Sequence, residues 1–164
     1  MTLWQSDKAR RGPRPLFQFW LRAAQTAPPV VSHFCRFMLA VTRFIYKVEI
    51  ASSTRIGPGL YIGHPYCITI NTSAVLGSNI NIHKGVTIGR ESRGHREGVP
   101  TIGNCVWIGV NATIVGRVTI GDDVLIAPNT FVNCDVPPHS VVFGNPCIIK
   151  HRDNATEGYI LNRV

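Results

Sequence analysis

The chain has 164 residues, enough for one domain with a buried core, and it carries 17 Lys and Arg against nine Asp and Glu. Eight of these cations and two of the anions lie in residues 1–50, so the basic character belongs to an N-terminal arm. The five cysteines form no CxxC pair, which argues against a disulfide framework or a zinc knuckle and predicts reduced thiols in a cytoplasmic protein. No apolar segment is long enough to predict a membrane span, and no nucleic-acid-binding module is recognisable.

Residues 1–48 are predicted to form this basic arm, which includes a short α-helical segment. Residues 1–15, with the run Arg10-Arg11-Gly12-Pro13-Arg14-Pro15, are expected to be extended or disordered. A short helix is predicted over Leu16–Thr26, because Pro28-Pro29 ends it.

A second, amphipathic helix is predicted between residues 31 and 48. Its apolar residues recur at spacings of three and four: Val31, Phe34, Phe37, Met38, Val41, Ile45 and Val48. Two interpretations stay open. The apolar face packs on the main domain or on a neighbouring subunit, or the helix makes a peripheral contact with a membrane surface, since Arg and Lys line its other face.

Residues 49–150 follow a period of six, which predicts an all-β domain built as a parallel β-helix of hexapeptide repeats. Three hexads make one triangular coil, and each aliphatic side chain points inward and stacks on its equivalent in the next coil. The in-step aliphatics are Ile50, Ile56, Ile62, Ile70, Leu76, Ile82, Ile88, Ile102, Ile108, Ile114, Ile120, Ile126 and Val132.

Two interruptions of the repeat are the places where function is expected, because a β-helix of perfect hexads has smooth faces. The first interruption is IGHPYCITI (Ile62 to Ile70), which places His64 beside a proline and an aromatic residue. The second is the polar segment Arg90 to Thr101, which should project as a loop from one corner of the rigid scaffold.

In six short runs, the sequence resembles the serine acetyltransferase branch of the hexapeptide-repeat acyltransferases. The runs are VEI (Val48 to Ile50), GLYIGH (Gly59 to His64), GVTIG (Gly85 to Gly89), PTIG (Pro100 to Gly103), WIG (Trp107 to Gly109) and VPPHSVVFGNP (Val136 to Pro146). The resemblance implies a left-handed β-helix and an acetyl-CoA-dependent O-acetyltransferase without a metal.

The resemblance also implies roles for individual residues. His64 would be the general base that takes the proton of the acceptor hydroxyl, since an imidazole titrates near working pH. An acidic residue at Glu49 would support the imidazolium, and the acetyl-CoA arm would lie in a groove between neighbouring subunits of a trimer. The residues implied to bind acetyl-CoA are Gly89, Arg90, Gly109, Val110 and Ala127.

The spacing itself supports these roles only in part. Glu49 and His64 are separated by less than the three hexads of a full coil, so they fall on adjacent coils out of register. Lys84 falls one coil above His64, where a cation would favour the neutral imidazole. Lys150 and Arg152, at the end of the repeat, could meet the phosphates of CoA or simply be charged termination of the β-helix.

Three departures from the serine enzymes concern the acceptor. Those enzymes have an aspartate directly before the histidine, where this chain has Gly63, and an Arg-His pair on the loop, where it has Gly98 and Val99. They also carry a large N-terminal helical domain, which the shorter arm of residues 1–48 replaces here. A zwitterion such as serine needs both of its charges met.

The expected acceptor is therefore a glycan or glycan-precursor hydroxyl, as in short acetyltransferases of polysaccharide biosynthesis, and L-serine is the alternative. The candidate acceptor-binding residues are Tyr66, Lys84, Arg93 and His95. A trimeric scaffold without activity stays a remote alternative. A zinc site of the carbonic-anhydrase type is disfavoured, because the six histidines are spread along the chain and no two of them are close in sequence. Residues 151–164 are expected to be a loose C-terminal tail.

Overall fold

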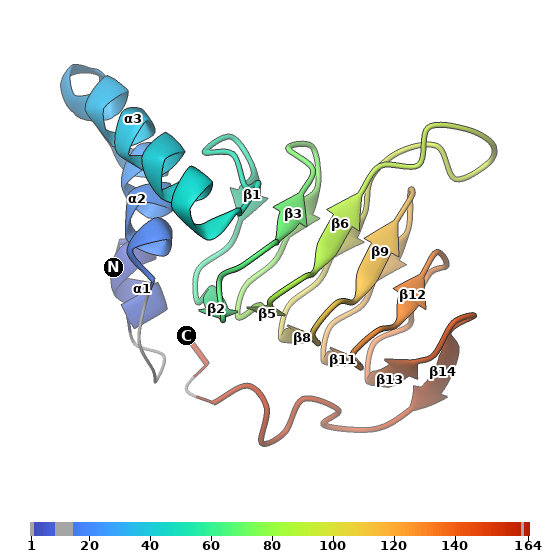
Figure 1. The fold of residues 1–164 in the computed structure, drawn as a ribbon. Coiled ribbons are helices and arrows are strands. Elements are labelled where there is room, and N and C mark those ends of the chain that lie inside the picture. The colour runs from blue at the N-terminus through green and yellow to red at the C-terminus, as the bar shows by residue number, and fades with distance from the viewer. Residues whose placement is uncertain (1, 9–14, 162) are drawn as a thin grey trace.

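The computed structural model describes residues 2–8, 15–161 and 163–164, and three helices precede the strands (Figure 1). These are α1 (Leu3–Lys8), α2 (Leu16–Thr26) and α3 (Pro29–Tyr46). Both predicted helices are confirmed, α2 with its predicted bounds. The prediction of an extended or disordered N-terminus is wrong for α1, and the run from Arg10 to Arg14 lies outside the described residues. Among the described helices, none is long and apolar enough to cross a bilayer.

Short strands wind into a parallel β-helix with three flat faces, and each face is one sheet. The first sheet holds β1 (Arg55–Ile56), β4 (Val75–Leu76), β7 (Thr101–Ile102) and β10 (Thr119–Ile120). The second holds β2 (Tyr61–Gly63), β5 (Asn81–His83), β8 (Val106–Ile108), β11 (Val124–Ile126), β13 (Ser140–Phe143) and β14 (Ile148–His151). The third holds β3 (Thr69–Ile70), β6 (Thr87–Gly89), β9 (Thr113–Val115) and β12 (Phe131–Val132). Only the β13–β14 pair among these is antiparallel.

The hexad aliphatics form the core, as the period of six predicts. All of the in-step residues from Ile50 to Val132 are buried, and none is more than 6% exposed. The strand register stacks them in columns, for example Ile62 beside Ile82 and Ile82 beside Ile108. Burying one such side chain contributes roughly 1.5–3 kcal/mol, so these columns are a major source of stability.

Side chains of α1 and α2 form hydrogen bonds with backbone groups at the open edge of the first coil. The Arg22 guanidinium donates to the carbonyls of Ile56 and Gly57 at 2.9 and 2.6 Å, and the Asp7 carboxylate accepts from the Leu60 amide at 2.9 Å. Arg22 and Asp7 also pair with each other at 2.8 Å, and both are buried. An unpaired edge of this kind is costly or prone to pair with another chain, so this contact explains why α1 is ordered against the β-helix.

The C-terminal segment is packed along the β-helix, so the prediction of a loose tail is wrong. The Asp123 carboxylate accepts hydrogen bonds from the amides of Ala155 and Thr156 at 2.9 and 3.0 Å, and Thr156 is fully buried. The ring of Tyr159 lies 5.0 Å from that of Trp107 on β8. These contacts hold the segment against the second sheet.

Candidate active site

His64 lies at a corner of the β-helix where the chain passes from the second sheet to the third. It directly follows β2, has a positive φ of 56°, and its carbonyl accepts a hydrogen bond from the Tyr66 amide at 2.8 Å. The hexad carries two extra residues here, and Cys67 also has a positive φ. The interruption is therefore a tight turn that presents the His64 side chain outward.

A cleft of about 340 Å³ surrounds this side chain, and we call it the His64 cleft. Three tyrosines and two histidines give it walls that combine aromatic surface with hydrogen-bonding groups. The cleft brings together His64, the predicted general base, and Tyr66, a predicted acceptor-binding residue. Its lining is Pro15, Tyr46, Tyr61, Ile62, Gly63, His64, Pro65, Tyr66 and His83.

His83 is a second histidine of this cleft, and its role was not predicted from the sequence. It is the last residue of β5 and pairs in register with Gly63 on β2. Its ring lies 4.9 Å from that of Trp107 and 6.5 Å from that of Tyr61. Burial, and then the nearby His64, hold the pKa of His83 below its ordinary value. The buried Nε2 atom makes no hydrogen bond in the part of the chain that the structure describes, which further disfavours the charged ring.

The imidazole of His83 fills the space that a side chain at position 63 would occupy. A Cβ atom placed on Gly63 would lie 2.9 Å from both Cε1 and Nδ1 of that ring. This close approach explains physically why glycine stands here, where the resemblance implies an aspartate. The sequence signal that could have predicted this contact is that positions 63 and 83 lie one coil apart. The two extra residues after His64 obscured that spacing.

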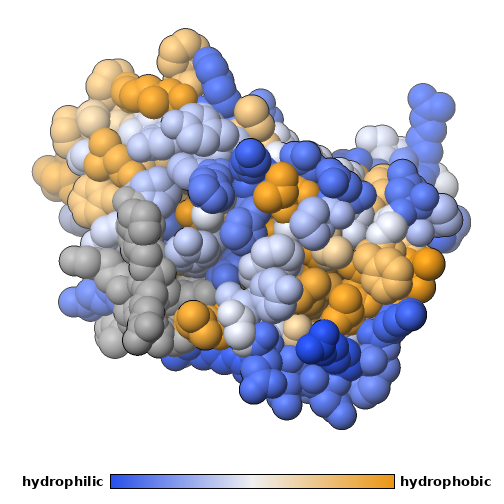
Figure 2. Space-filling view, turned by 60° about the horizontal axis from the view of Figure 1, so that its bottom comes forward, coloured by the Kyte–Doolittle hydropathy of each residue, from blue (hydrophilic) through white to orange (hydrophobic). Residues whose placement is uncertain are grey.

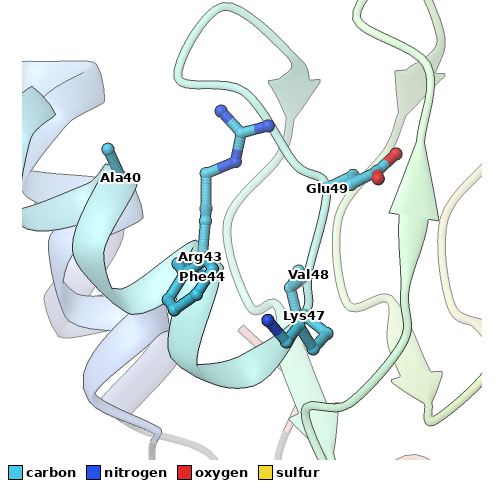
Figure 3. Close-up of a pocket in the computed structure, with 6 residues that line it drawn as sticks. All are labelled: Ala40, Arg43, Phe44, Lys47, Val48 and Glu49. Atoms are coloured by element: carbon cyan, nitrogen blue, oxygen red, sulfur yellow. The ribbon is translucent and has the colours of Figure 1, made fainter.

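Glu49 does not meet His64 within one chain. It pairs with Thr69 at the start of the third sheet and lines a different cleft, with Arg43, Phe44 and neighbouring residues of α3. In Figure 3 its carboxylate points away from Phe44, toward the adjacent strand. Among the described ion pairs and hydrogen bonds, none joins Glu49 to His64, so the predicted support of the imidazolium is not formed in this geometry.

Several predicted residues lie in one column of corners above His64, between the second and third sheets. Lys84 takes the corner one coil above, since Gly63 pairs with His83. The amide of Asn111 donates to the Lys84 carbonyl, and that of Asn129 donates to the Val110 carbonyl, so each corner stacks on the next. Gly109 and Ala127 belong to the same column; a Cβ on Gly109 would meet the Ala127 carbonyl carbon at 2.9 Å. We call this the corner column.

The loop predicted between Arg90 and Thr101 does project (Figure 1). It leaves from the end of β6 on the third sheet, on the side away from the corner column. Arg93 and His95 are exposed on it, and Gly89 and Arg90 lie at its base. Because β6 and its neighbours separate this side from the corner column, the structure does not bring Arg93 or His95 to His64 within one chain. The loop is held by an Arg90–Glu97 ion pair at 3.2 Å and by a hydrogen bond from Arg96 to the Asn133 carbonyl.

Lys150 and Arg152 lie away from the corner column. The antiparallel turn into β14 reverses the chain, so Lys150 pairs with Val141 from β14, the edge strand of the second sheet. The Arg152 amide donates to the carbonyl of His139, which directly precedes β13 at the end of the strand away from the corner column. These cations therefore do not line the corner column, and their contact with CoA phosphates stays a prediction. Among the described residues, no group of three His, Cys, Asp or Glu is placed to hold a metal ion.

Comparisons with known proteins give this site a context. Residues 100–134 match the family model described as bacterial transferase hexapeptide (six repeats). The chain is 34% identical over 110 residues to the serine acetyltransferase of Helicobacter pylori, covering 67% of this chain and 64% of that protein. It is 34% identical over 123 residues to the serine acetyltransferase of Staphylococcus xylosus, covering 75% and 57%.

A solved structure extends the similarity to the fold. The serine acetyltransferase of Neisseria gonorrhoeae, in complex with serine, superposes with a TM-score of 0.68 at 27% identity, covering 90% of this chain and 69% of that one. The repeat and the three-faced coil thus define a hexapeptide-repeat protein of the transferase type. Within that class, the relatives to which the chain is similar are serine acetyltransferases. The chain spans less than two thirds of the length of the two curated relatives named above.

Proposed function

We propose that the protein is an acetyl-CoA-dependent O-acetyltransferase in which His64 is the general base. The observation that carries the proposal is the His64 cleft, where an outward imidazole lies beside a second imidazole that disfavours charge. Because the His64 ring is exposed in the cleft whereas Nε2 of His83 is buried, His64 is the imidazole that takes the proton of an acceptor hydroxyl. Charge on His64 then disfavours charge on His83 further.

The reaction follows from these positions by direct attack. The acceptor oxygen loses its proton to His64 and bonds to the thioester carbonyl carbon of acetyl-CoA. The C–S bond then breaks, and the imidazolium returns the proton to the CoA sulfur. No cysteine nucleophile is needed, although exposed Cys67 lies on the same turn as His64.

The corner column is the proposed binding site of the acetyl-CoA arm. It continues from His64 past Lys84 and Val110 in steps of about 4.8 Å, the distance between paired strands. An extended chain can follow such a column with its acetyl end at His64. The tight stacking at Gly109 leaves the column without a protruding side chain at that corner. The geometry supports Lys150 and Arg152 less well, because β14 carries them away.

L-serine is the acceptor that the relatives favour, since the similar enzymes bear the name serine acetyltransferase and one was solved with serine. This reverses the preference for a glycan that the sequence departures alone gave. The glycan hydroxyl is retained as the second candidate on one observation. The His64 cleft holds a neutral imidazole where an ammonium group would need a carboxylate, and its tyrosines suit a sugar ring.

A trimer with active sites between subunits is part of the same proposal. Within one chain the third sheet separates the projecting loop from His64, so a neighbour's loop is the natural second wall. A threefold arrangement would bring the loop edge of one subunit to the corner column of the next. The expected contact with a membrane also remains a proposal, and it depends on the surface of α3.

The test is release of CoA thiol from acetyl-CoA by the purified protein, with L-serine or a soluble disaccharide as the sole acceptor. Turnover with serine supports the first acceptor, and turnover with the disaccharide alone supports the second. If neither acceptor is used and acetyl-CoA gives no protection against heating, the protein is a scaffold and the proposed function is wrong.

A further inference from the structure

The outer side of α3 is an exposed apolar stripe. Its members recur at spacings of three, four and one residues, so they share one face of the helix. Only Cys35, Leu39 and Thr42 of α3 are buried, so the helix packs on the protein through a narrow inner side. The α3 stripe consists of Val30, Phe34, Phe37, Val41, Phe44 and Ile45, which are 93, 58, 64, 36, 74 and 59% exposed.

This exposure overturns the expectation that the apolar face packs on the main domain. Figure 2 shows apolar side chains gathered over the helical end of the molecule. The stripe runs over about 22 Å at 1.5 Å per residue. An apolar surface of this extent on a helix needs a partner.

The charges on α3 and its C-terminal cap are all of one sign. Arg36, Arg43 and Lys47 form a row next to the stripe, and no Asp or Glu lies between Pro29 and Val48. The Lys47 ammonium lies 3.7 Å from the centre of the Phe44 ring, so cation and apolar surface are in contact. Figure 3 shows Arg43 and Lys47 beside Phe44 at this end of the helix.

We propose that the α3 stripe lies on the surface of an anionic lipid bilayer. A phenylalanine-rich face flanked by cations suits such a surface, because the rings enter the acyl boundary while Arg and Lys reach the phosphates. A second copy that pairs its own α3 with this one is a poorer occupant, since two α3 helices face to face would bring their cationic rows together without an acidic residue on either helix.

This contact would place the candidate active site beside the bilayer. Tyr46, the last residue of α3, has its ring 5.7 Å from that of Tyr66, and both line the His64 cleft. The cleft therefore lies about one helix diameter, roughly 10 Å, from the lipid surface. An acceptor hydroxyl on a lipid-anchored headgroup fits this placement. That last step rests on the proposed transferase function, whereas the membrane contact does not.

The test is sedimentation of the full chain with vesicles of phosphatidylcholine alone and with vesicles that also contain phosphatidylglycerol. The proposal expects binding to the anionic vesicles that weakens with added salt. Phe34→Ser/Phe37→Ser/Phe44→Ser should reduce this binding at least tenfold. The matched control is Ile148→Ser, since that side chain is 53% exposed on β14, away from α3, and should bind like the unchanged protein.

Three results would overturn the proposal. The unchanged protein would fail to bind anionic vesicles, the triple variant would bind as well as the control, or the triple variant would lower the oligomeric mass measured by light scattering without lipid. The last result would assign the stripe to a contact between copies. Vesicle binding is measured without turnover, so a failure of the transferase proposal is seen separately in the CoA-release assay.

Discussion

Substituting Gly63 tests the fit between the two strands that form the His64 cleft. Gly63→Ala adds only a Cβ atom, and that atom would lie 2.9 Å from two atoms of the His83 ring. Ordinary contacts between carbon atoms lie at about 3.5–4.0 Å, so the ring must move by roughly 0.6–1 Å. Trp107, at 4.9 Å between ring centres, limits that movement.

The expected cost follows from this crowding. Forcing one extra carbon into a packed site costs about 1–3 kcal/mol in the free energy of unfolding. Gly63 has no positive φ, so backbone strain adds nothing to that figure. If His83 is first shortened to serine, the space opens, and the same Gly63→Ala change should cost only a small fraction of that figure.

The assay is denaturant unfolding of four proteins at one concentration: unchanged, Gly63→Ala, His83→Ser and the double variant. The account predicts a coupling between the two positions of at least about 1 kcal/mol, within the range found for residues in contact. Equal costs of Gly63→Ala in both backgrounds would refute the claim that His83 excludes a side chain at position 63. The Gly63→Asp variant in the His83→Ser background then asks whether a carboxylate improves turnover with L-serine.

Three further predictions concern the parts that hold the scaffold. Arg22→Ala removes the buried ion pair with Asp7 and should lower the free energy of unfolding by about 3–5 kcal/mol in denaturant; a cost under about 1 kcal/mol would count against a structural role of this ion pair. Burial raises the pKa of Asp123, but hydrogen bonds led by that of Thr156 outweigh burial and hold it below the ordinary value. Its stabilisation should therefore be complete above the unfolded value of about 3.9 and be lost as the pH falls through the lower folded pKa. In Asp123→Asn, hydrogen exchange of the C-terminal segment should lose this acid-side change, and an unaltered profile would contradict the assignment. Arg96→Ala removes the link from the projecting loop to the carbonyl after β12, so limited proteolysis should cut residues 90–101 faster without a large fall in Tm; equal cutting rates would oppose this.

The β-helix was predictable because its signal is local and repeated. An inward aliphatic at every sixth position shows in the sequence without knowledge of any contact, and the columns from Ile50 to Val132 follow from it. The helix over Leu16–Thr26 was predictable for a similar reason, since two prolines close it. His64 stood out because the rhythm breaks there.

The parts that the sequence did not predict depend on contacts between distant positions. Residues 3–8 are helical where Asp7 reaches Arg22 and Leu60, which no local pattern reveals. The importance of His83 depends on Gly63, its partner on the preceding coil. The C-terminal segment is held by distant positions, among them the Asp123 carboxylate and the Trp107 ring. Arg152 leaves the corner column because β14 reverses direction. The exposure of the α3 stripe was not predictable for the same reason. The spacing of apolar residues predicts an apolar face on the helix, but it does not tell whether that face packs on the protein or faces outward.

The central claim is that His64 takes the proton of the acceptor hydroxyl, and steady-state CoA release in the presence of L-serine tests it most directly. The comparison is between the unchanged protein, His64→Ala and His33→Ala, an exposed histidine on α3 that serves as the matched control. A positioned general base contributes about 10²–10⁴-fold, so the account predicts a loss of at least about 100-fold in kcat for His64→Ala and an unchanged rate for His33→Ala. A His64→Ala variant within about threefold of the unchanged rate would contradict it.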